Sequence, residues 1–489
     1  MTSERTRWLF AGQLGSQFDD GGRILLIEAR SVFARRPMHR AKAHLILSAL
    51  RHRVRELGDR VEFHQVERYA DVVDGRDDLE AINPTSWSAR RFVQKRGIPT
   101  LPSRGFVTSE DDFRIWADSR GAHRLLLEDF YRDVRTRTGI LMEGTAPTGG
   151  TWNYDHDNRQ PPPKNAATLG LAPWWPTEDD IDDEVRADLD RWQNEGVVTL
   201  LGDDGPRRFA ATETEAQLAL DDFLTYRLPD FGPYEDATLQ GDWTMAHSLL
   251  SAPMNFGLLD PREVVEAAEA RYRDGEAPLN SVEGFIRQIA GWRDYVWHLY
   301  WRLGEHYPTQ SNYLRATTPL PEAFTALDPE LITAHCLRET IDGMRRHGWA
   351  HHIQRLMVLG NWSLQHGYDP VALNQWFIDM FVDGTPWVMP ANVIGMSQHA
   401  DGGIVATKPY AAGGAYINRM SDYCGSCRFD PKKRLGEDAC PFTAGYWAFL
   451  DRNESRLAGN ARMRQSLAGL RGLSDREAVV DQERRRESW

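Results

Sequence analysis

Four cysteines are the residues of this sequence whose type and spacing most clearly suggest chemistry. The 489-residue chain contains only these: Cys336, Cys424, Cys427 and Cys440. The middle two form a Cys-x-x-Cys pair, which can hold one metal centre from a single tight turn, and Gly425 suits that turn. Proline directly after the last cysteine, here Pro441, is common in iron–sulfur proteins. The spacing therefore predicts one tetrathiolate metal site.

The spacing does not decide between two metals. A Cys₄ zinc site uses the same four residues as an iron–sulfur cluster, so both remain open. Two disulfides are disfavoured, because disulfide-built scaffolds are short and rich in cysteine, whereas this chain is long and poor in it.

Histidines form a second group. His351 and His352 are adjacent, and His347 lies one helical turn earlier. Histidine titrates near neutral pH, so a pocket histidine can donate a proton to a substrate. On a helix, adjacent side chains point about 100° apart, so we expect only one of the pair to face a ligand squarely. A metal pair of His347 and His351 lacks the glutamate of a metalloprotease helix, and a structural role is the other alternative.

Two further segments are compatible with a bound cofactor. In His247–Pro253, hydroxyls beside a helix start can bind phosphate, although a helix N-cap needs the same residues. In 392–403, Asn392, Asp401 and two glycines allow close backbone approach to a flat ligand. Trp376, taken alone, reads as a core tryptophan.

The elements that position these residues are of two kinds. Trp8–Phe10, Ile24–Glu28 and Val61–Val66 read as short buried strands, and Arg40–Leu57 reads as a helix ending at Gly58. Strands alternating with helices predict a parallel α/β sheet over about residues 1–135. Ligands on such sheets lie outside the carboxyl ends of the strands, here the turn containing Gln13 and the neighbourhood of Glu28. Taken alone, this turn favours a plain loop over a ligand site.

The rest of the chain divides again. Residues 140–235 look irregular and polar, as in an interdomain crossing, and later segments have helical periodicity without strand patterns. We predict an α/β plus all-α protein divided at 1–138, 139–235 and 236–489. The helical segments are Val264–Asp274, Val282–Leu303, Pro329–His347, Ala350–His366, Pro370–Val382 and Phe442–Asn453, after two earlier helices, Asp111–Ser119 and Arg124–Arg137.

Composition excludes some functions. The net charge of −13 argues against a surface coated in basic residues, so any DNA contact needs a local basic face. No stretch approaches 18 apolar residues, so we expect no membrane span. Met1–Arg7 is polar and leads straight into a strand-like run, which argues against a signal peptide. With reduced thiols, this predicts a cytoplasmic protein.

Together these motifs resemble one family. The chain is similar to the iron–sulfur branch of the photolyase and cryptochrome superfamily, the bacterial (6-4) photolyases and proteobacterial cryptochromes, from the first strand to about Met463. The most specific segments are GGTWNYDHDNR (149–159), HSLLSAPMNFGLL (247–259), AHHIQRLMVLGN (350–361), NVIGMSQHADGG (392–403), KPYAAGGAYINRMSDYCGSCRFD (408–430) and ACPF (439–442).

The resemblance implies an antenna-binding α/β domain, an interdomain connector and a helical domain that holds FAD and a 4Fe–4S cluster. The four cysteines would hold the cluster. Ser248, Leu249 and Ser251 would hold the FAD phosphates. Gln288 and Arg293 would reach the flavin, and Asp383, Asn392 and Asp401 would line its isoalloxazine and ribityl side. Trp376 would carry electrons to the flavin, and Gln13 and Glu28 would lie at the antenna site.

The implied activity is repair of (6-4) photoproducts in UV-damaged DNA by an electron from photoexcited reduced FAD, in a monomeric protein. His351 and His352 would lie at the lesion, and a histidine would donate a proton. A damaged dinucleotide is cheap to flip out of the duplex. Arg428, Lys432, Lys433 and Arg434 are candidates for a basic rim around the pocket, and a solvated loop is the alternative.

Two other functions stay open at this point. One is a cryptochrome-type blue-light photoreceptor with the same cofactors. The other is an iron–sulfur nucleic-acid-binding module without photochemistry, resembling the large subunit of primases. The histidine pair favours repair, and the FAD segments disfavour the module.

Two departures from the family pattern affect these expectations. The first turn reads Ala11-Gly12-Gln13-Leu14, where the family has Gly-Asp-Gln-Leu and the Asp helps to hold a 6,7-dimethyl-8-ribityllumazine antenna. We therefore expect weakened lumazine binding. Phe377 follows Trp376, where relatives often carry tyrosine. Phenylalanine is a poor electron relay, which leaves room for another aromatic route.

Overall fold

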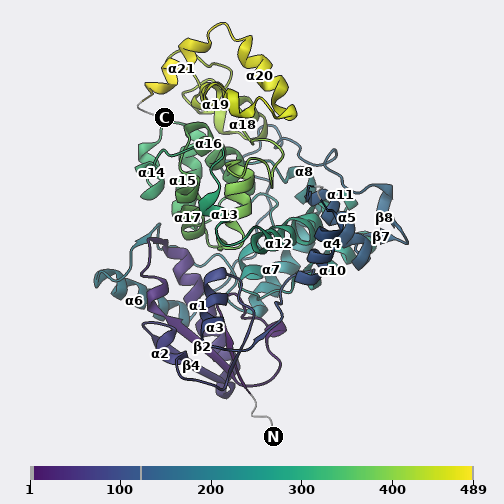
Figure 1. Ribbon diagram of the computed structural model, residues 1–489, viewed down its shortest axis with the longest axis vertical. Helices are drawn as coiled ribbons and strands as arrows, with labels where there is room; N and C mark the ends of the chain where they lie inside the picture. The colour runs from purple at the N-terminus through teal and green to yellow at the C-terminus, as the bar shows by residue number, and fades with distance from the viewer. Residues whose placement is uncertain (1–4, 122–123, 487–489) are drawn as a thin grey trace.

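A parallel sheet unit forms one end of the molecule, and helices form most of the rest (Figure 1). The computed structural model describes residues 5–121 and 124–486, so Met1–Glu4 of the polar N-terminal segment lie outside the described residues. The sheet has the strand order β4-β2-β1-β5-β6, and all its pairs are parallel. Its strands are β1 (Thr6–Leu9), β2 (Ile24–Ala29), β4 (Val61–Val66), β5 (Leu79–Ile82) and β6 (Thr100–Leu101).

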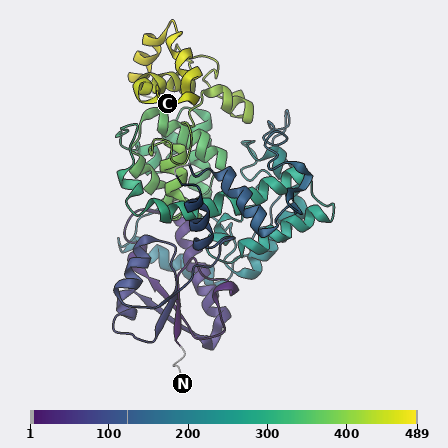
Figure 2. The ribbon, with the colours of Figure 1, turned by 45° about the vertical axis from the view of Figure 1, so that its right-hand side comes forward.

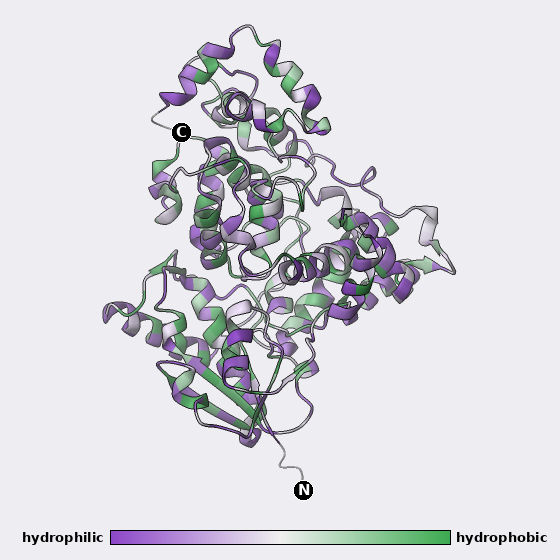
Figure 3. Cartoon of the chain, viewed as in Figure 1, coloured by the Kyte–Doolittle hydropathy of each residue, from purple (hydrophilic) through white to green (hydrophobic). Residues whose placement is uncertain are grey.

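The central strands are apolar because helices cover both faces of the sheet. Every residue of β2 is buried, and Figure 3 shows the central strands as hydrophobic. The first covering helix, α1 (Arg40–Leu57), has the predicted bounds and ends at Gly58, whose φ of 55° suits glycine. Two shorter helices, α2 (Ala70–Val73) and α3 (Trp87–Lys95), complete this unit. The predicted α/β unit is confirmed.

The helical remainder confirms the predicted all-α half. Across described residues 236–486 there are isolated β-bridges but no named strand. The α-helices of this part are α9 (Ser251–Asn255), α10 (Pro261–Arg273), α11 (Leu279–Ile286), α12 (Asp294–Leu303), α13 (Tyr307–Gln310), α14 (Glu322–Thr325), α15 (His335–His347), α16 (Asn361–His366), α17 (Pro370–Met380), α18 (Gly414–Met420), α19 (Pro441–Leu457), α20 (Arg464–Arg471) and α21 (Arg476–Arg484). No helix in the described ranges is both long and apolar enough to cross a membrane.

Three π-helical segments interrupt these helices. They are η5 (Arg287–Arg293), η7 (Gln354–Gly360) and η8 (Ala391–Ser397). Two of them pack closely, because a Cβ added at Gly360 would lie 2.2 Å from the Ser397 hydroxyl oxygen. π-Helical turns are rare and occur frequently at functional sites, so these segments mark where a site is expected.

The segment predicted to be irregular, 140–235, contains three helices, and that prediction is wrong. They are α6 (Asp180–Asn194), α7 (Glu213–Tyr226) and α8 (Leu228–Tyr234). In α6, Ile181, Val185, Leu189 and Trp192 are buried along one face. Asp179 caps this helix and forms a capping box with Asp182. The sequence did not predict this helix, because acidic residues separate the members of its apolar stripe.

Two helices from the first part of the sequence pack on the helical part instead of the sheet. They are α4 (Glu110–Ser119) and α5 (Leu127–Thr138), which lie beside α10 and α12 in Figures 1 and 2. Phe113 stacks on His298 with ring centroids 4.6 Å apart, and the Tyr295 hydroxyl donates to the Leu125 carbonyl at 2.6 Å. The predicted division of the chain at residues 138 and 235 stays a prediction.

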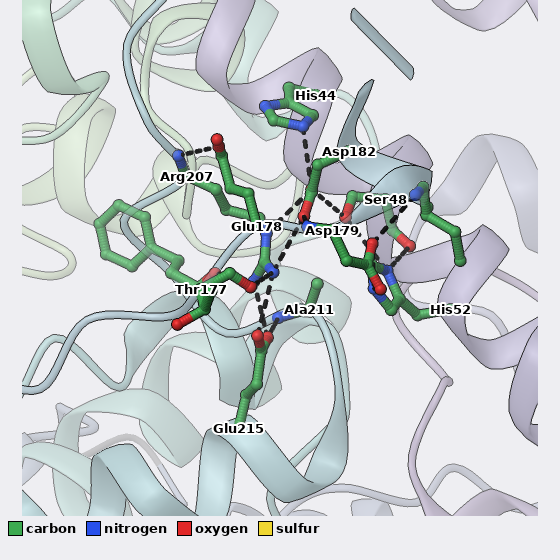
Figure 4. A network of polar contacts seen from close by, with 12 residues as sticks. His44, Ser48, His52, Thr177, Glu178, Asp179, Asp182, Arg207, Ala211 and Glu215 are labelled. Atoms are coloured by element: carbon green, nitrogen blue, oxygen red, sulfur yellow. Dashed lines mark hydrogen bonds and ion pairs between the residues drawn. The ribbon is translucent and has the colours of Figure 1, made fainter. Parts of the chain in front are cut away.

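A buried polar network joins α1 to α6 and to residues 207–215 (Figure 4). Asp182 accepts from His44 Nε2 at 3.0 Å, from Ser48 Oγ at 2.7 Å and from Arg207 Nε at 3.0 Å. Arg207 also donates to Glu215 at 2.6 Å. Burial alone would raise the pKa of Asp182, but the hydrogen bonds from His44 and Arg207 outweigh it and hold that pKa well below its ordinary value.

We expect Arg207→Met to destabilise the protein by about 3 kcal/mol, because it leaves a buried carboxylate without its guanidinium. The urea midpoint measures this. Because the pKa of Asp182 is depressed in the folded state, its stabilisation is present above about pH 3.9 and is lost as the pH falls through the folded pKa. The difference in urea midpoint between the unmodified protein and Arg207→Met should therefore become smaller at acidic pH. The control is Arg91→Met, which removes an exposed pair with Glu305 and should cost at most about 1 kcal/mol. Equal midpoints for both variants would show that the network does not stabilise the fold.

Candidate functional site

The four cysteines line one cavity between two helices. Cys336 lies in the first turn of α15, Cys424 in the short turn η9 (Tyr423–Gly425), and Cys440 is the residue before α19. The apolar wall includes Ile417, Phe429 and Phe442, and all four thiols are free. The structure thus brings together the four predicted ligands, although Cys336 and Cys440 lie 104 positions apart in the sequence.

The sulfur spacing bears on the choice of metal. No three of the four Sγ atoms lie within 4.8 Å of one another. A tetrahedral zinc ion with Zn–S bonds of about 2.3 Å would hold all four sulfurs about 3.8 Å apart. A cluster in which each cysteine binds a different iron needs the wider spacing. The donor set and its apolar wall therefore fit an iron–sulfur cluster better than a single ion.

Three histidines meet at a second site. The rings of His247 and His351 are 3.9 Å apart between centroids, and those of His247 and His352 are 5.2 Å apart. The rings of His351 and His352 stack at 4.8 Å with an interplanar angle of 23°. The two adjacent rings therefore lie on the same side, and the expectation that only one of them faces a ligand squarely stays a prediction.

The reason is that His351 precedes the helix. Its Nδ1 accepts from the Ile353 amide at 3.1 Å, and its own amide donates to Gln354 Oε1 at 2.9 Å, as in a capping box. Gln354 in turn donates to the Tyr423 hydroxyl at 2.7 Å, and Tyr423 lines the cysteine cavity. Two hydrogen bonds thus connect the histidine site to the cysteine cavity.

The surroundings of the three rings differ. Because Nδ1 of His351 accepts a hydrogen bond, its Nε2 carries the hydrogen, and this atom is buried without a partner. Burial, and then His247, hold the pKa of His351 well below its ordinary value. Burial, and then His352, lower the pKa of His247 to about 3. His352 is the exposed member of the group, and its Nε2 lies 3.0 Å from Asp236 Oδ1.

His247 was not among the predicted catalytic residues. The signal was present, since it begins the segment HSLLS that we had assigned only to phosphate binding. Asp236 was also missed, and nothing in its sequence context marks it.

Asp383 is the centre of a third polar group. Arg355 donates to it through Nη1 at 2.9 Å and Nη2 at 3.0 Å, and the Ser251 hydroxyl donates to it at 2.7 Å. Ser251 and Asp383, predicted for opposite ends of a cofactor, therefore contact each other directly. Arg355 was missed, although it lies one turn after the histidine pair, and its guanidinium carbon is 4.2 Å from the Phe381 ring centroid.

The other residues predicted to contact the flavin lie on the π-helical segments. Gln288 and Arg293 lie on η5, and Asn392 lies on η8. The Arg293 guanidinium lies near the rings of Phe106 and Trp387, and burial lowers its pKa to about 10. Its Nε is buried without a partner. An orphaned guanidinium nitrogen beside aromatic rings fits an acceptor on a flat ligand.

The predicted phosphate and ribityl residues show two further features. Leu249 adopts a φ of 60°, which is strained for a branched side chain and is typical of functional sites. The Ser248 hydroxyl accepts only weakly from the Leu250 amide, at 3.3 Å. Asp401, in contrast, is fully engaged, because it accepts from Tyr307 at 2.9 Å and from two backbone amides. These residues fit FAD, apart from Asp401, which shapes the loop.

Trp376 lies on α17 with its indole nitrogen donating to the Phe324 carbonyl at 2.8 Å. Its ring contacts Phe324 at 5.2 Å, Phe377 at 5.3 Å and Phe381 at 6.0 Å between centroids. It is therefore surrounded by phenylalanine.

The two residues predicted for the antenna are used inside the protein. The Gln13 amide donates to the Ile82 carbonyl at 3.2 Å and accepts from the Phe10 amide at 3.2 Å. Glu28 is buried and forms a bidentate pair with Arg51 at 2.8 and 2.9 Å. Neither side chain has an atom free for a ligand, so these residues do not fit a lumazine.

We expect the purified protein to carry little lumazine, and Gly12→Asp not to restore it. A Cβ at this position would lie 3.1 Å from the Asn255 carbonyl oxygen, which leaves the new carboxylate little freedom. Chromatography of the released chromophores measures occupancy. Full occupancy in either protein would show that the antenna is held by residues other than Gln13 and Glu28.

The basic run predicted near DNA is partly neutralised within the protein. Lys433 pairs with Asp438 at 2.5 Å, and Arg434 pairs with Asp475 at 3.0 Å. Arg428 lies over the Phe429 ring at 5.1 Å, and Lys432 is exposed. Only part of this run is therefore available to a phosphate backbone.

Comparison with known proteins adds independent findings. Residues 11–197 match the model of a family described as deoxyribodipyrimidine photo-lyase-related protein. The chain is 42% identical over 462 residues to a protein of Agrobacterium fabrum named (6-4) photolyase, covering 89% of this chain and 88% of that one. It is also 41% identical over 107 residues to the uncharacterized protein R855 of Acanthamoeba polyphaga mimivirus, covering 22% of this chain and 80% of that one.

Two solved structures share the fold. One is a bacterial class III photolyase from Agrobacterium tumefaciens, with a TM-score of 0.54 and 17% identity, covering 100% of this chain and 91% of that one. The other is the cryptochrome of Synechocystis sp. PCC6803, with a TM-score of 0.55 and 12% identity, covering 96% of this chain and 99% of that one. At these identities the likeness concerns the fold alone.

Proposed function

Because this chain belongs to the family of bacterial (6-4) photolyases and photo-lyase-related proteins, we propose that it repairs (6-4) photoproducts in UV-damaged DNA under blue light. The observation that carries this proposal is the histidine site. A lesion that accepts an electron must also accept a proton, and His352, paired with Asp236 and exposed, is placed to hold one.

The three histidines divide the work at the lesion. His352 holds the proton, and Asp236 orients its ring and balances the charge. His351 presents a fixed Nε2–H group, which can donate a hydrogen bond to the flipped base without changing its charge. His247 is fixed by its Nε2, which donates to the Glu235 carbonyl at 3.1 Å, and it closes the site from the other side.

FAD, when bound, supplies the light-driven electron, and the chain's own residues position it. Ser248 and Leu249 would bind its phosphates, and Arg293 and Asn392 would contact the ring system. The Arg355–Asp383 pair would fix the edge of the site, because Ser251 and Asn255 both bind Asp383 and hold it in place. The segment η7 packs closely on η8 beside this region.

The cysteine cavity would hold a 4Fe–4S cluster. The sulfur spacing and the apolar wall support this assignment over zinc. In this arrangement the cluster ties α15 to α19 and, through Tyr423 and Gln354, steadies the histidine site. The proposed role of the cluster is therefore to fix the site's geometry. A monomeric state and a cytoplasmic location stay predictions.

Illumination of a duplex that carries one (6-4) photoproduct tests the function. With reduced FAD and blue light, we expect the intact pyrimidines to return, and we expect no conversion in the dark. A protein that binds FAD and responds to light but leaves the lesion unchanged would favour the photoreceptor alternative. A protein without FAD would favour the non-photochemical alternative.

A further inference from the structure

We propose that Lys42 is a positioning residue of the flavin site, which reaches from the α/β unit to fix the turn that carries Asp383. The proposal rests on the proposed function, because it needs FAD beside Asp383 and Arg355. It goes beyond that function by giving a residue of the α/β unit a part in how tightly the helical part binds its cofactor, and by making that binding depend on pH.

The ammonium group of Lys42 is buried against backbone carbonyls of the helical part. Lys42 lies on α1 and is only 7% exposed. Its Nζ donates to the Gly384 carbonyl at 2.6 Å and to the Ile378 carbonyl. Ile378 belongs to the last turn of α17, where carbonyls have no partner within the helix and a positive charge is favourable. Lys42 therefore caps the C-terminus of a helix in the other part of the molecule.

The turn that Lys42 holds, residues 381–384, wraps closely around the end of α17. A Cβ added at Gly384 would lie 2.5 Å from the Phe377 carbonyl oxygen, so glycine is needed for this approach. The Gly384 amide donates to the Phe381 carbonyl at 2.9 Å. The position of Gly384 is therefore fixed through its amide by the turn and through its carbonyl by Lys42.

Asp383 directly precedes Gly384 and binds three residues of the site. Its carboxylate accepts from Arg355 at 2.9 and 3.0 Å and from the Ser251 hydroxyl at 2.7 Å. Its backbone carbonyl accepts from Asn255 Nδ2 at 3.0 Å. One residue thus separates the carbonyl that the lysine holds from the carboxylate that organises these contacts, so a shift of the turn would move that carboxylate.

The charges around Lys42 place its protonation near neutral pH. Burial lowers the pKa of Lys42, Asp379 and Asp383 raise it, Arg36 lowers it, and the resulting pKa is about 8. His39, just before α1, adds no charge at pH 7, because burial lowers its pKa to about 4. Lys42 is therefore charged at pH 7 and largely neutral at pH 9, where it no longer balances the two carboxylates.

Two effects of opposite sign follow from this pKa. Because the pKa of Lys42 in the folded protein lies below its ordinary value of 10.5, the unfolded chain binds more protons between about pH 8 and pH 10. The contribution of Lys42 to the free energy of unfolding therefore rises across this range. FAD affinity should fall across the same range, because the neutral amine holds the turn less firmly. A residue that only stabilised the fold would not separate the two effects.

Arg36 supplies the matched control. It is half-exposed and donates to the Asp379 carboxylate at 2.8 and 3.2 Å, so it binds the same helix as Lys42. Its printed partners do not include the turn 381–384. Arg36→Met thus removes a cation from the same region and leaves the contacts of Gly384 in place.

The test compares FAD binding by Lys42→Met and Arg36→Met. Each protein, purified with its FAD, is diluted at pH 7 and at pH 9, and the fluorescence of released FAD gives the dissociation constant. We expect Lys42→Met to bind FAD about tenfold more weakly than the unmodified protein at pH 7, within the usual range of coupling between sites. The unmodified protein should lose affinity at pH 9, whereas Lys42→Met should change little.

The control and a second readout sharpen the test. Arg36→Met should match the unmodified protein at pH 7 and, because Arg36 lowers the pKa of Lys42, should lose less affinity at pH 9. Urea unfolding of the FAD-free proteins gives the second readout. Relative to Lys42→Met, the unmodified protein should gain stability between pH 7 and pH 9 while it loses affinity for FAD.

Three results would overturn the proposal. They are equal FAD affinity in Lys42→Met and the unmodified protein, an equal loss in Arg36→Met at pH 7, and unchanged affinity of the unmodified protein between pH 7 and pH 9. The last result needs no variant, so it decides the matter even if Lys42→Met does not fold.

This role and the repair function fail in different ways. If FAD binding follows the predicted pattern but the (6-4) photoproduct stays unrepaired, the repair function is wrong and the role of Lys42 stands. If the protein repairs the lesion but binds FAD equally at both pH values, only the role of Lys42 is wrong. Absence of FAD from the purified protein would overturn both.

Discussion

Cys440→Ser is expected to remove the iron and to destabilise the helical part more than a typical single substitution. A structural metal centre contributes on the order of 10 kcal/mol to folding, whereas the average point mutation costs about 1 kcal/mol. Cys440 directly precedes α19 and Cys336 lies in the first turn of α15, so a metal held by both would join two helices that are distant in sequence. Loss of one metal ligand should therefore destabilise the packing of both helices. Iron content and the thermal midpoint measure the effect.

The matched control is Ser426→Ala, in the same turn as Cys424 and Cys427 but outside the ligand set. It should keep its iron. Iron content unchanged in Cys440→Ser would contradict the assignment of this residue as a ligand. Stoichiometric zinc in the unmodified protein would replace iron–sulfur by the alternative metal.

His352→Ala is expected to lower (6-4) repair by about 10²–10⁴-fold, the usual contribution of a positioned general acid. His351→Ala should also cripple repair, because it removes the fixed Nε2–H donor and the helix cap. FAD content and photoreduction should survive in both, since the residues proposed for those steps lie elsewhere. Normal repair by both variants would show that the proton comes from another group.

Asp236→Asn tests whether His352 is the proton donor or has only a structural role. Asparagine removes the carboxylate charge that faces the His352 ring, so we expect (6-4) repair to fall while FAD and iron content stay unchanged. His351→Gln, which keeps a donor of similar length, should recover part of the activity that His351→Ala loses. Normal repair by Asp236→Asn would remove His352 from the acid role.

Local periodicity predicted much of this fold. The bounds of α1 follow from a regular apolar stripe that ends at glycine, and β1 and β2 are buried as predicted. The prediction that β4 is buried is wrong, because this strand lies at the edge of the sheet and mixes polar with apolar residues. The helix α6 was missed, because its stripe of Ile181, Val185, Leu189 and Trp192 is embedded in acidic residues. Capping signals at Asp179 and Asp182 would have revealed it.

The site was harder to predict, because its geometry depends on backbone details. The π-helical segments arise from a shift in hydrogen-bond register that leaves no periodic trace in the sequence. The placement of His351 just before its helix turns two rings to the same side, which a continuous helix would not allow. Asp236 reaches His352 across 116 positions, so only the fold reveals this pair.

The central claim is tested most directly by following the lesion itself. Two matched duplexes, one with a (6-4) photoproduct and one with a cyclobutane dimer at the same position, are mixed with dithionite-reduced protein and illuminated with blue light. Chromatography of the digested strands then quantifies each lesion. The account predicts light-dependent return of the (6-4) photoproduct to intact pyrimidines, with the cyclobutane dimer left unchanged. An unchanged (6-4) photoproduct in protein with fully reduced FAD would contradict it.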